Sequence, residues 1–270
     1  MNTHLWRLTT IVLLSITHCA LYAQHLPGIQ KGSLHAPANV KTDGKATEWR
    51  NKFQAFNNAT EVYYTLANDD KNLYLAIQAV KPTIIAKALR GGIVFTINHS
   101  TGKSDKQPVV VSFPIYDSGK DGLQITQSIN KKISDTRDTV IIKRETDSLM
   151  NITNKLLSEK LKKIKVLGTK PVIDTFISVY NEEGFEAAAR VDHKRACTIE
   201  IAIPLKYLGL PVDKPFAYNV KLNASSVMNN MIINRDGRGN IVSINVGGVS
   251  GATQSNGYDT DFWAEYTLKQ

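Results

Sequence analysis

Short apolar segments that alternate with polar residues recur along the chain, and this pattern limits the fold more than any other feature. Thr198–Leu205 is the clearest case, because isoleucines occupy every second position with Glu200 and Ala202 between them. A period of two places the isoleucines on one face of a strand, so we expect that face to be buried and Glu200 to point to solvent. Similar segments cover residues 61–66, 73–80, 93–98, 109–113, 176–180, 185–191, 216–222 and 262–268.

Polar turns separate neighbouring members of this series. Residues 67–72 (ANDDKN) predict a hairpin between the two segments on either side of them. Residues 181–184 (NEEG) predict a second hairpin, with a glycine where a positive φ is useful. Many short strands joined by turns predict an all-β fold, a β-sandwich of the immunoglobulin-like or jelly-roll type.

One stretch, residues 145–165, departs from the strand pattern. Its apolar residues follow a helical spacing, and Lys155, Lys160, Lys162 and Lys163 lie among the other positions. The apolar stripe consists of Leu149, Ile152, Leu156, Leu157, Leu161 and Ile164. We therefore predict a helical insertion, within about 118–170, whose apolar face packs against the sandwich. Its basic face is interpreted as a solvated helix surface, with attraction to a polyanion or to lipid head groups as the alternative.

The first residues have the features of an export signal. Arg7 precedes a short apolar run, and small Ala23 stands where a signal peptidase cuts. The run is far shorter than the ~20 residues of a membrane span, so we expect no membrane-spanning segment. We predict a signal peptide over 1–23, a linker over 24–36 and one domain over 37–270. Cys19 leaves a lipid anchor as an alternative. The destination is the periplasm, the cell surface or the extracellular space.

The composition after the predicted cleavage narrows the range of partners. The remaining 247 residues hold 32 basic and 24 acidic side chains, a net charge of +8. Such a charge favours anionic surfaces or polymers, and we expect no nucleic-acid partner. Cys197 is then the only cysteine, so no disulfide forms within the chain, and we interpret it as a buried, inert thiol.

Catalytic motifs are lacking. The six histidines are scattered, no His-Glu-x-x-His or phosphate-binding loop occurs, and Gly248–Ala252 lacks the last glycine of a nucleophile elbow. Glu182 and Glu183 are neighbours in a turn, where they do not face each other as glycosidase carboxylates must. We therefore predict a protein that binds rather than an enzyme.

Five short blocks, in order, resemble family 9 carbohydrate-binding modules and the wider group of DOMON-like domains. The first, Thr42–Trp49, is similar to an Asp-Gly motif followed by tryptophan. The hairpin Asn68–Leu75 and the strand Glu200–Gly209 are similar to the family's "D-x-x-x-L-Y-L" and "E-x-A-I-P-x-x-x-L-G". Phe216–Val220 resembles "G-F-N-V", and Phe262–Tyr266 resembles the closing strand. The resemblance implies a sandwich fold and a carbohydrate, including polysaccharide, as ligand.

The family clamps a sugar between two aromatic rings, and this chain keeps one of them. The approach to strand 93–98 reads Ala88–Gly92, with Arg90 where an aromatic residue is expected. Tyr258 is the counterpart of the second ring, while Trp49 and Trp263 are interpreted as core or half-buried residues. Arg90 and the positive charge favour an acidic glycan, although a role for Arg90 in capping a turn is equally open. The candidate ligand contacts are Tyr258, Asp259, Arg90, Asn98, His99 and Tyr116.

Two other functions stay open. Some DOMON-like domains hold haem, and Met228, Met231 and Lys221 are the residues that such a site would use. A non-catalytic structural or assembly role in the cell envelope is the other. We expect no cofactor and leave open a structural calcium ion, the identity of the sugar and the oligomeric state.

Overall fold

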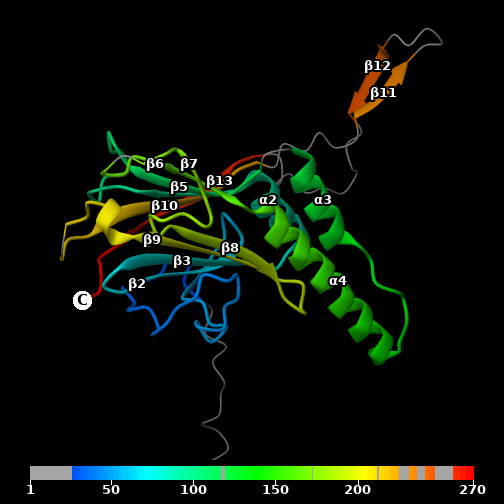
Figure 1. The fold of residues 1–270 in the computed structure, drawn as a ribbon, viewed down its shortest axis with the longest axis horizontal. Helices are drawn as coiled ribbons and strands as arrows, with labels where there is room; N and C mark the ends of the chain where they lie inside the picture. The colour runs from blue at the N-terminus through cyan, green and yellow to red at the C-terminus, as the bar shows by residue number, and fades with distance from the viewer. Residues whose placement is uncertain are drawn as a thin grey trace, which may run out of the picture.

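The chain is mostly β, with two antiparallel sheets and three helices in its described part (Figure 1). The computed structural model describes residues 26–116, 119–171, 173–211, 213–224, 231–235, 241–246 and 258–270. The predicted signal peptide with Cys19 and Ala23, and the Gly248–Ala252 loop, lie outside these residues. The two sheets are consistent with the predicted β-sandwich.

The first sheet has five strands in the order β1-β2-β3-β9-β8. Its strands are β1 (Ala55–Asn57), β2 (Val62–Asn68), β3 (Asn72–Ala79), β9 (Cys197–Pro204) and β8 (Glu186–Val191). The predicted hairpin at 67–72 is confirmed, since β2 and β3 pair on either side of it. The Asp69 carboxylate closes this turn by accepting hydrogen bonds from the main-chain N–H groups of Lys71 and Asn72.

The second sheet has six strands in the order β13-β10-β4-β5-β6-β7. Its strands are β13 (Thr260–Tyr266), β10 (Phe216–Leu222), β4 (Ile93–Ile97), β5 (Val109–Ile115), β6 (Lys163–Leu167) and β7 (Phe176–Ser178). β11 (Met231–Arg235) and β12 (Ile241–Val246) form a separate antiparallel pair.

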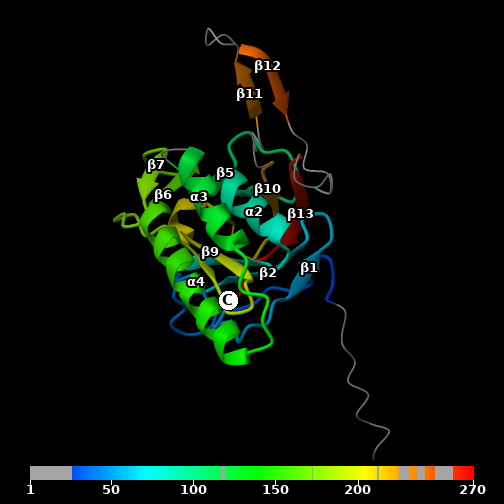
Figure 2. The same cartoon turned by 90° about the vertical axis from the view of Figure 1, so that its right-hand side faces the viewer.

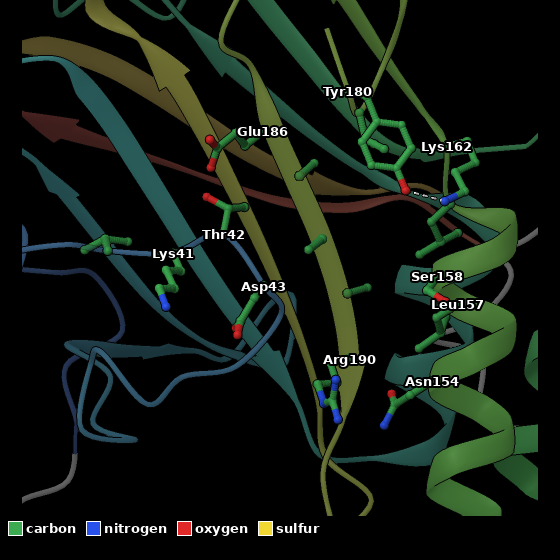
Figure 3. Close-up of a pocket in the computed structure, with 16 residues that line it drawn as sticks. Lys41, Thr42, Asp43, Asn154, Leu157, Ser158, Lys162, Tyr180, Glu186 and Arg190 are labelled. Atoms are coloured by element: carbon green, nitrogen blue, oxygen red, sulfur yellow. Dashed lines mark hydrogen bonds between the residues drawn. The ribbon is translucent and has the colours of Figure 1, made fainter.

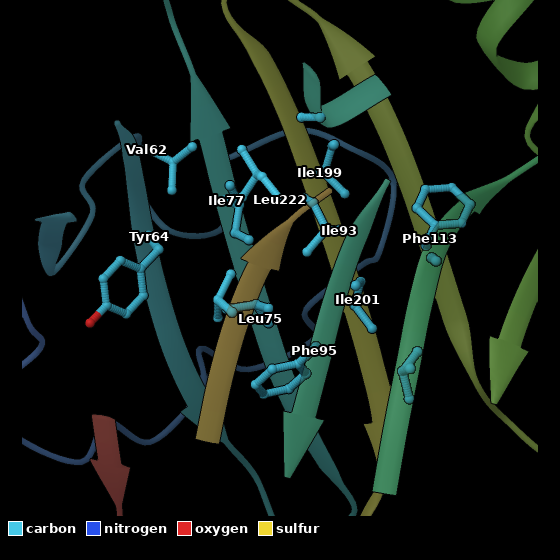
Figure 4. Packing of buried hydrophobic residues seen from close by; sticks show 14 of the residues in the cluster. Val62, Tyr64, Leu75, Ile77, Ile93, Phe95, Phe113, Ile199, Ile201 and Leu222 are labelled. Atoms are coloured by element: carbon cyan, nitrogen blue, oxygen red, sulfur yellow. The ribbon is translucent and has the colours of Figure 1, made fainter. Parts of the chain in front are cut away.

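The hydrophobic core lies between the two sheets (Figure 4). β3 and β9 contribute Leu75, Ile77, Ile199 and Ile201, and Phe95 of β4 faces them from the other sheet. Cys197 belongs to the same cluster and is buried as predicted, and burial raises the pKa of its thiol to about 12. Removing this apolar surface from water is the main favourable term in folding.

Three helices lie side by side at one margin of the sheets (Figure 2). They are α2 (Pro82–Gly91), α3 (Gly119–Asn130) and α4 (Thr139–Lys160), and α4 also contacts β8. α2 was not predicted from the sequence. It begins with proline at its first position, where the missing N–H costs no intrahelical bond.

The predicted helix over 145–165 is wrong at both ends. α4 begins six residues earlier, at Thr139, where the Asp138 carboxylate accepts hydrogen bonds from the N–H groups of Val140 and Ile141. It ends at Lys160, and Ile164 lies in strand β6 instead. The reason is the local alternation in Lys163–Leu167, which buries Ile164 and Val166 and leaves Lys163, Lys165 and Leu167 more exposed. The stretch 118–170 is therefore not purely helical, because β6 completes part of the second sheet.

The predicted hairpin around 181–184 is also wrong. β7 pairs with β6 in the six-stranded sheet, whereas β8 pairs with β9 in the five-stranded sheet. The turn therefore carries the chain from one sheet to the other. Asn181 shapes it, because its side-chain oxygen accepts hydrogen bonds from the N–H groups of Gly184 and Phe185.

The segment predicted as a linker, 24–36, packs against the domain where it is described. Gln30 is buried, and its side chain makes two hydrogen bonds with the main chain of Leu66. The main chain of Leu34 and Ala36 pairs with Asn68. These contacts make residues 27–36 part of the packed structure.

None of the helices in the described part of the chain combines the length and apolar character needed to cross a membrane.

Candidate functional site

A groove of about 540 Å³ runs between α4 and β8 (Figure 3). Its floor is Ala187–Arg190 of β8, and one wall is the last two turns of α4, from Asn154 to Leu161. The segment Val40–Asp43 forms the opposite wall, and Lys162 and Tyr180 close one end. We call this feature the α4–β8 groove. Three successive alanines, Ala187–Ala189, leave no large side chain in the floor.

Tyr180 presents the main aromatic surface of the groove. Tyr180 is 76% exposed, although it follows closely on β7, in which Ile177 is buried. Lys162 lies beside it, with Nζ donating a hydrogen bond to Tyr180 Oη at 2.6 Å and lying 4.7 Å from the ring centroid. Lys162 therefore contacts the hydroxyl and one face of the Tyr180 ring, and the rest of the ring is exposed to solvent.

Charged groups of both signs surround the alanine floor. Glu186 and Arg190 are exposed at the two ends of the floor. Lys41 and Asp43 stand on the facing wall, where Asp43 forms an ion pair with Lys45 at 2.5 Å. A ligand in the groove would therefore contact an apolar floor that is surrounded by both hydrogen-bond donors and acceptors. A few polar groups around an apolar floor are a common feature of small-molecule sites.

A second hollow of about 340 Å³ continues from the groove past Arg190 and Asn154, which line both. Its lining residues include the amide side chains of Asn51, Gln78 and Asn151. The two hollows together form a long track of mixed polar and apolar lining beside α4. Such a shape accommodates an extended ligand better than a compact one.

Glu200 anchors the wall formed by residues 41–49, and its position corrects the sequence analysis. It was expected to point to solvent, but it is 4% exposed. Its Oε2 accepts hydrogen bonds from the N–H groups of Asp43 and Gly44 at 3.1 and 2.9 Å, and its Oε1 accepts one from Trp49 Nε1 at 2.9 Å. The segment that carries the Asp-Gly and tryptophan motif therefore covers this face of the sheet.

Gly44 is the point where this segment comes closest to the sheet. Its φ is +77°, and a Cβ there would lie 2.7 Å from the main-chain N of Arg190 and 2.8 Å from the carbonyl carbon of Ala189. Both obstacles are backbone atoms of β8, so they cannot move aside cheaply. Only glycine fits, which gives the Asp-Gly sequence a structural reason.

We expect Glu200 to make stability depend on pH. Burial raises the pKa of its carboxyl from 4.5 to about 7, and the three N–H donors oppose the rise only in part. The pKa of Glu200 is higher in the folded chain than in the unfolded chain, so its protonation stabilises the fold. This stabilisation is fully present below about pH 4.5 and is lost as the pH rises to about 7, and the stability does not change further above that pH. The loss is on the order of 3 kcal/mol, since one pKa unit equals about 1.4 kcal/mol.

The measurement is urea unfolding between about pH 4.5 and about pH 7.5, for wild type and Glu200→Gln. The glutamine variant has no charge at this position, so its unfolding free energy should change less over this window. Equal pH dependence in the two proteins would contradict an uptake of a proton by Glu200 on folding.

Four of the six sequence-predicted site residues gather at one end of the six-stranded sheet, away from the groove floor. Arg90 ends α2 just before β4, Tyr116 follows β5, and Tyr258 with Asp259 precedes β13. Gly122 of α3 lies against Arg90 and Tyr116, since a Cβ there would be 3.7 Å from Arg90 Cγ. Arg90 stands in a helix rather than in the expected loop.

Two of these four have partners within the protein. The Tyr116 hydroxyl donates a hydrogen bond to the Leu89 carbonyl, and burial raises the pKa of this hydroxyl. Asp259 accepts hydrogen bonds from the N–H of Ala224 and from Lys221 Nζ, which lower the pKa of its carboxyl. Tyr258, by contrast, is 73% exposed.

The remaining two, Asn98 and His99, lie at the opposite end of the sheet. β4 separates them from Arg90, and its five residues span about 16 Å. Asn98 is buried and donates to the Gly102 carbonyl, while His99 Nδ1 lies 2.7 Å from Asp105 Oδ2. The six residues therefore do not form one site.

The residues named for haem or a metal give no assembled centre within the described part. Met228 and the side chain of Met231 lie outside it, and Lys221 pairs with Asp259 at 3.1 Å. Among the described residues, no three His, Cys, Asp or Glu side chains gather closely enough to hold a metal ion.

The sequence analysis missed Tyr180, Lys162 and Arg190, which the structure brings to the groove. One signal was available, because an aromatic residue directly before a polar turn has few ways to be buried.

No family model matches the chain, and no curated protein is significantly similar to it.

Proposed function

We propose that this protein is an exported, non-catalytic module that binds a carbohydrate chain in the α4–β8 groove. The observation that carries the proposal is the exposed ring of Tyr180 at the end of a groove with an alanine floor and a polar rim. Two predictions from the sequence support the proposal: the five motif blocks that resemble family 9 carbohydrate-binding modules, and the signal peptide. A β-sandwich of the immunoglobulin-like or jelly-roll type, which we propose for this chain, agrees with them.

The chemistry of the groove suits a sugar better than an apolar ligand. A pyranose ring offers an apolar C–H face that stacks on an aromatic ring and a rim of hydroxyls that both donate and accept. Tyr180 supplies the ring, and Glu186 and Arg190 supply an acceptor and donors along the same groove. The amide-lined hollow beyond Arg190 extends the contact to further sugar units.

The test compares two tyrosines of nearly equal exposure, Tyr180 at 76% and Tyr258 at 73%. Titration calorimetry would use neutral and uronic-acid oligosaccharides on wild type, Tyr180→Ala and Tyr258→Ala. A stacked ring contributes about 0.5–1.5 kcal/mol beyond its buried area, so Tyr180→Ala should weaken binding by about tenfold. Tyr258→Ala should leave the affinity unchanged.

The opposite result, with only Tyr258→Ala weakening the affinity, would move the site to the end that holds Arg90 and Tyr116. An absence of binding across both classes of oligosaccharide would contradict the carbohydrate proposal itself.

A further inference from the structure

The guanidinium of Arg190 is a positive charge without an opposite charge bound to it. Arg190 is exposed near the end of β8 and lines both the α4–β8 groove and the second hollow beyond it. Within the described part of the chain, no aspartate or glutamate forms an ion pair with this side chain. The junction of the two hollows therefore offers a cation with five N–H donors to a ligand.

The base of the Arg190 side chain is confined by its surroundings. Its main chain belongs to β8 and is paired in register with Thr198 of β9. Gly44 lies against it from the other wall, since a Cβ on Gly44 would be 2.7 Å from the main-chain N of Arg190 and 2.8 Å from its Cβ. Glu200 in turn accepts a hydrogen bond from the N–H of Gly44 at 2.9 Å. A ligand that binds Arg190 therefore removes less conformational freedom than it would from a mobile loop.

Asn154 of α4 adds a donor of fixed orientation at the same junction (Figure 3). Its Oδ1 accepts a hydrogen bond from the N–H of Val191 at 2.8 Å, and its Nδ2 donates one to the Val191 carbonyl at 2.9 Å. These two bonds leave the second N–H of the amide for another acceptor. Because Asn154 and Arg190 line both hollows, an anion at the junction is within reach of the two side chains together.

The carboxylates that line this side of the hollows have partners of their own. Asp43 contacts Lys45 with both oxygens, because Oδ1 accepts a hydrogen bond from the main-chain N–H at 2.9 Å and Oδ2 pairs with Nζ at 2.5 Å. Asp192 accepts a hydrogen bond from the N–H of Lys194 at 2.8 Å. A carboxylate of the ligand would therefore bind Arg190 without displacing an internal ion pair.

The other end of the groove floor differs in charge. Glu186 and Lys162 lie toward the end that Tyr180 closes, where their charges offset each other. Four residues separate Glu186 from Arg190 along β8, a span of about 13 Å. Figure 3 shows Tyr180 and Arg190 at opposite ends of the groove. A single sugar ring does not reach from one to the other, so a ligand that contacts both is an oligosaccharide.

We propose that the α4–β8 groove selects acidic polysaccharides, with a uronic-acid carboxylate bound by Arg190 and Asn154. The planar guanidinium matches a carboxylate through two parallel N–H···O bonds. Such charge-assisted hydrogen bonds are roughly twice as strong as those to a neutral hydroxyl, so the acid is favoured over a neutral sugar. This inference rests on the proposed carbohydrate function, and adds the class of sugar and the residue that selects it.

The experiment changes the charge of the ligand and of the protein in turn. Titration calorimetry measures the binding of a uronic-acid oligosaccharide and of its methyl ester, which is the same sugar chain without the negative charges. Wild type should bind the acid at least about tenfold more tightly than the ester. Arg190→Gln should abolish this preference, by weakening the binding of the acid about tenfold while the affinity for the ester stays within about threefold of wild type.

Arg144→Gln is the matched control. Arg144 is an exposed arginine of α4 that lines neither hollow, and its replacement lowers the net charge by the same amount. Both affinities should therefore stay at the wild-type values. Thermal unfolding should be cooperative in both variants, because each removes an exposed side chain. The comparison of acid and ester on wild type tests the class of sugar even if Arg190→Gln does not fold.

Each further outcome overturns a different statement. Equal affinities of wild type for the acid and the ester would overturn the selection of acidic sugars and leave the carbohydrate function standing. A preference for the acid that survives Arg190→Gln, or that Arg144→Gln reduces equally, would overturn the assignment to Arg190. Binding of neither ligand, together with no binding of neutral oligosaccharides, would contradict the proposed function instead.

Discussion

Replacing Ile201 by aspartate should abolish cooperative folding. Ile201 is 2% exposed, lies in β9 between Leu75 of β3 and Ala187 of β8, and faces the second sheet (Figure 4). A carboxylate there has neither water nor a partner, and burying an unpaired charge costs more than about 5 kcal/mol. Domains are stable by only about 5–15 kcal/mol, so this one change removes most or all of the stability.

The measurement is thermal unfolding followed by near- and far-UV circular dichroism. Ile201→Val is the matched control, because it keeps the site apolar and should cost only about 1 kcal/mol. A cooperative melt of Ile201→Asp close to that of wild type would show that the inner face of β9 has been assigned wrongly.

The strands were predictable because burial on one face leaves a period of two in the sequence. Leu73, Leu75 and Ile77 of β3 show it, as do the isoleucines of β9, which were expected on a buried face. Pairing was predictable only where the turn is short and the strands are consecutive, as for β2 and β3. The turn after β7 is also short and polar, but the sheet in which β8 lies depends on β9, which follows β8 in the chain. No local pattern contains that information.

The candidate site was less predictable than the fold, because its walls come from distant segments. Tyr180 follows β7, Lys162 lies between α4 and β6, and Arg190 belongs to β8. The pairing of β6 with β7 brings Lys162 to Tyr180, and the packing of α4 beside β8 brings Arg190 to the same groove. The predicted ligand residues were chosen for strand ends, but a strand has two ends, and Arg90 and His99 lie at opposite ends of β4.

The position of Glu200 shows the limit of alternation as a signal. A period of two tells which residues share a face, but not whether the second face is covered by another part of the chain. Here the segment from Asp43 to Trp49 covers it, and all eight residues of β9 are buried. The same pattern in an open sheet would leave Glu200 in water.

Replacing Glu200 by alanine should therefore cost about 3 kcal/mol. The change leaves three N–H donors without their acceptor, two of them buried (Gly44 and Trp49) and one part-buried (Asp43), and each unsatisfied buried group costs about 1–3 kcal/mol. Water can partly enter the space left by the Glu200 side chain, so the total loss of stability should be smaller than the sum of the three separate costs. Glu265→Ala is the matched control, since Glu265 is also a strand glutamate but is exposed on β13 and should change stability by less than about 0.5 kcal/mol.

Urea unfolding of both variants at about pH 5, where Glu200 is largely protonated in the folded chain, gives the comparison directly. Trp49 fluorescence reports on the same contact, because the indole N–H loses its acceptor and the segment that covers the sheet loosens. Glu200→Ala should shift that emission before global unfolding, and Glu265→Ala should not. If the two alanine variants lose equal stability, the buried carboxylate does not hold the 41–49 segment, and the wall of the α4–β8 groove rests on its apolar contacts alone.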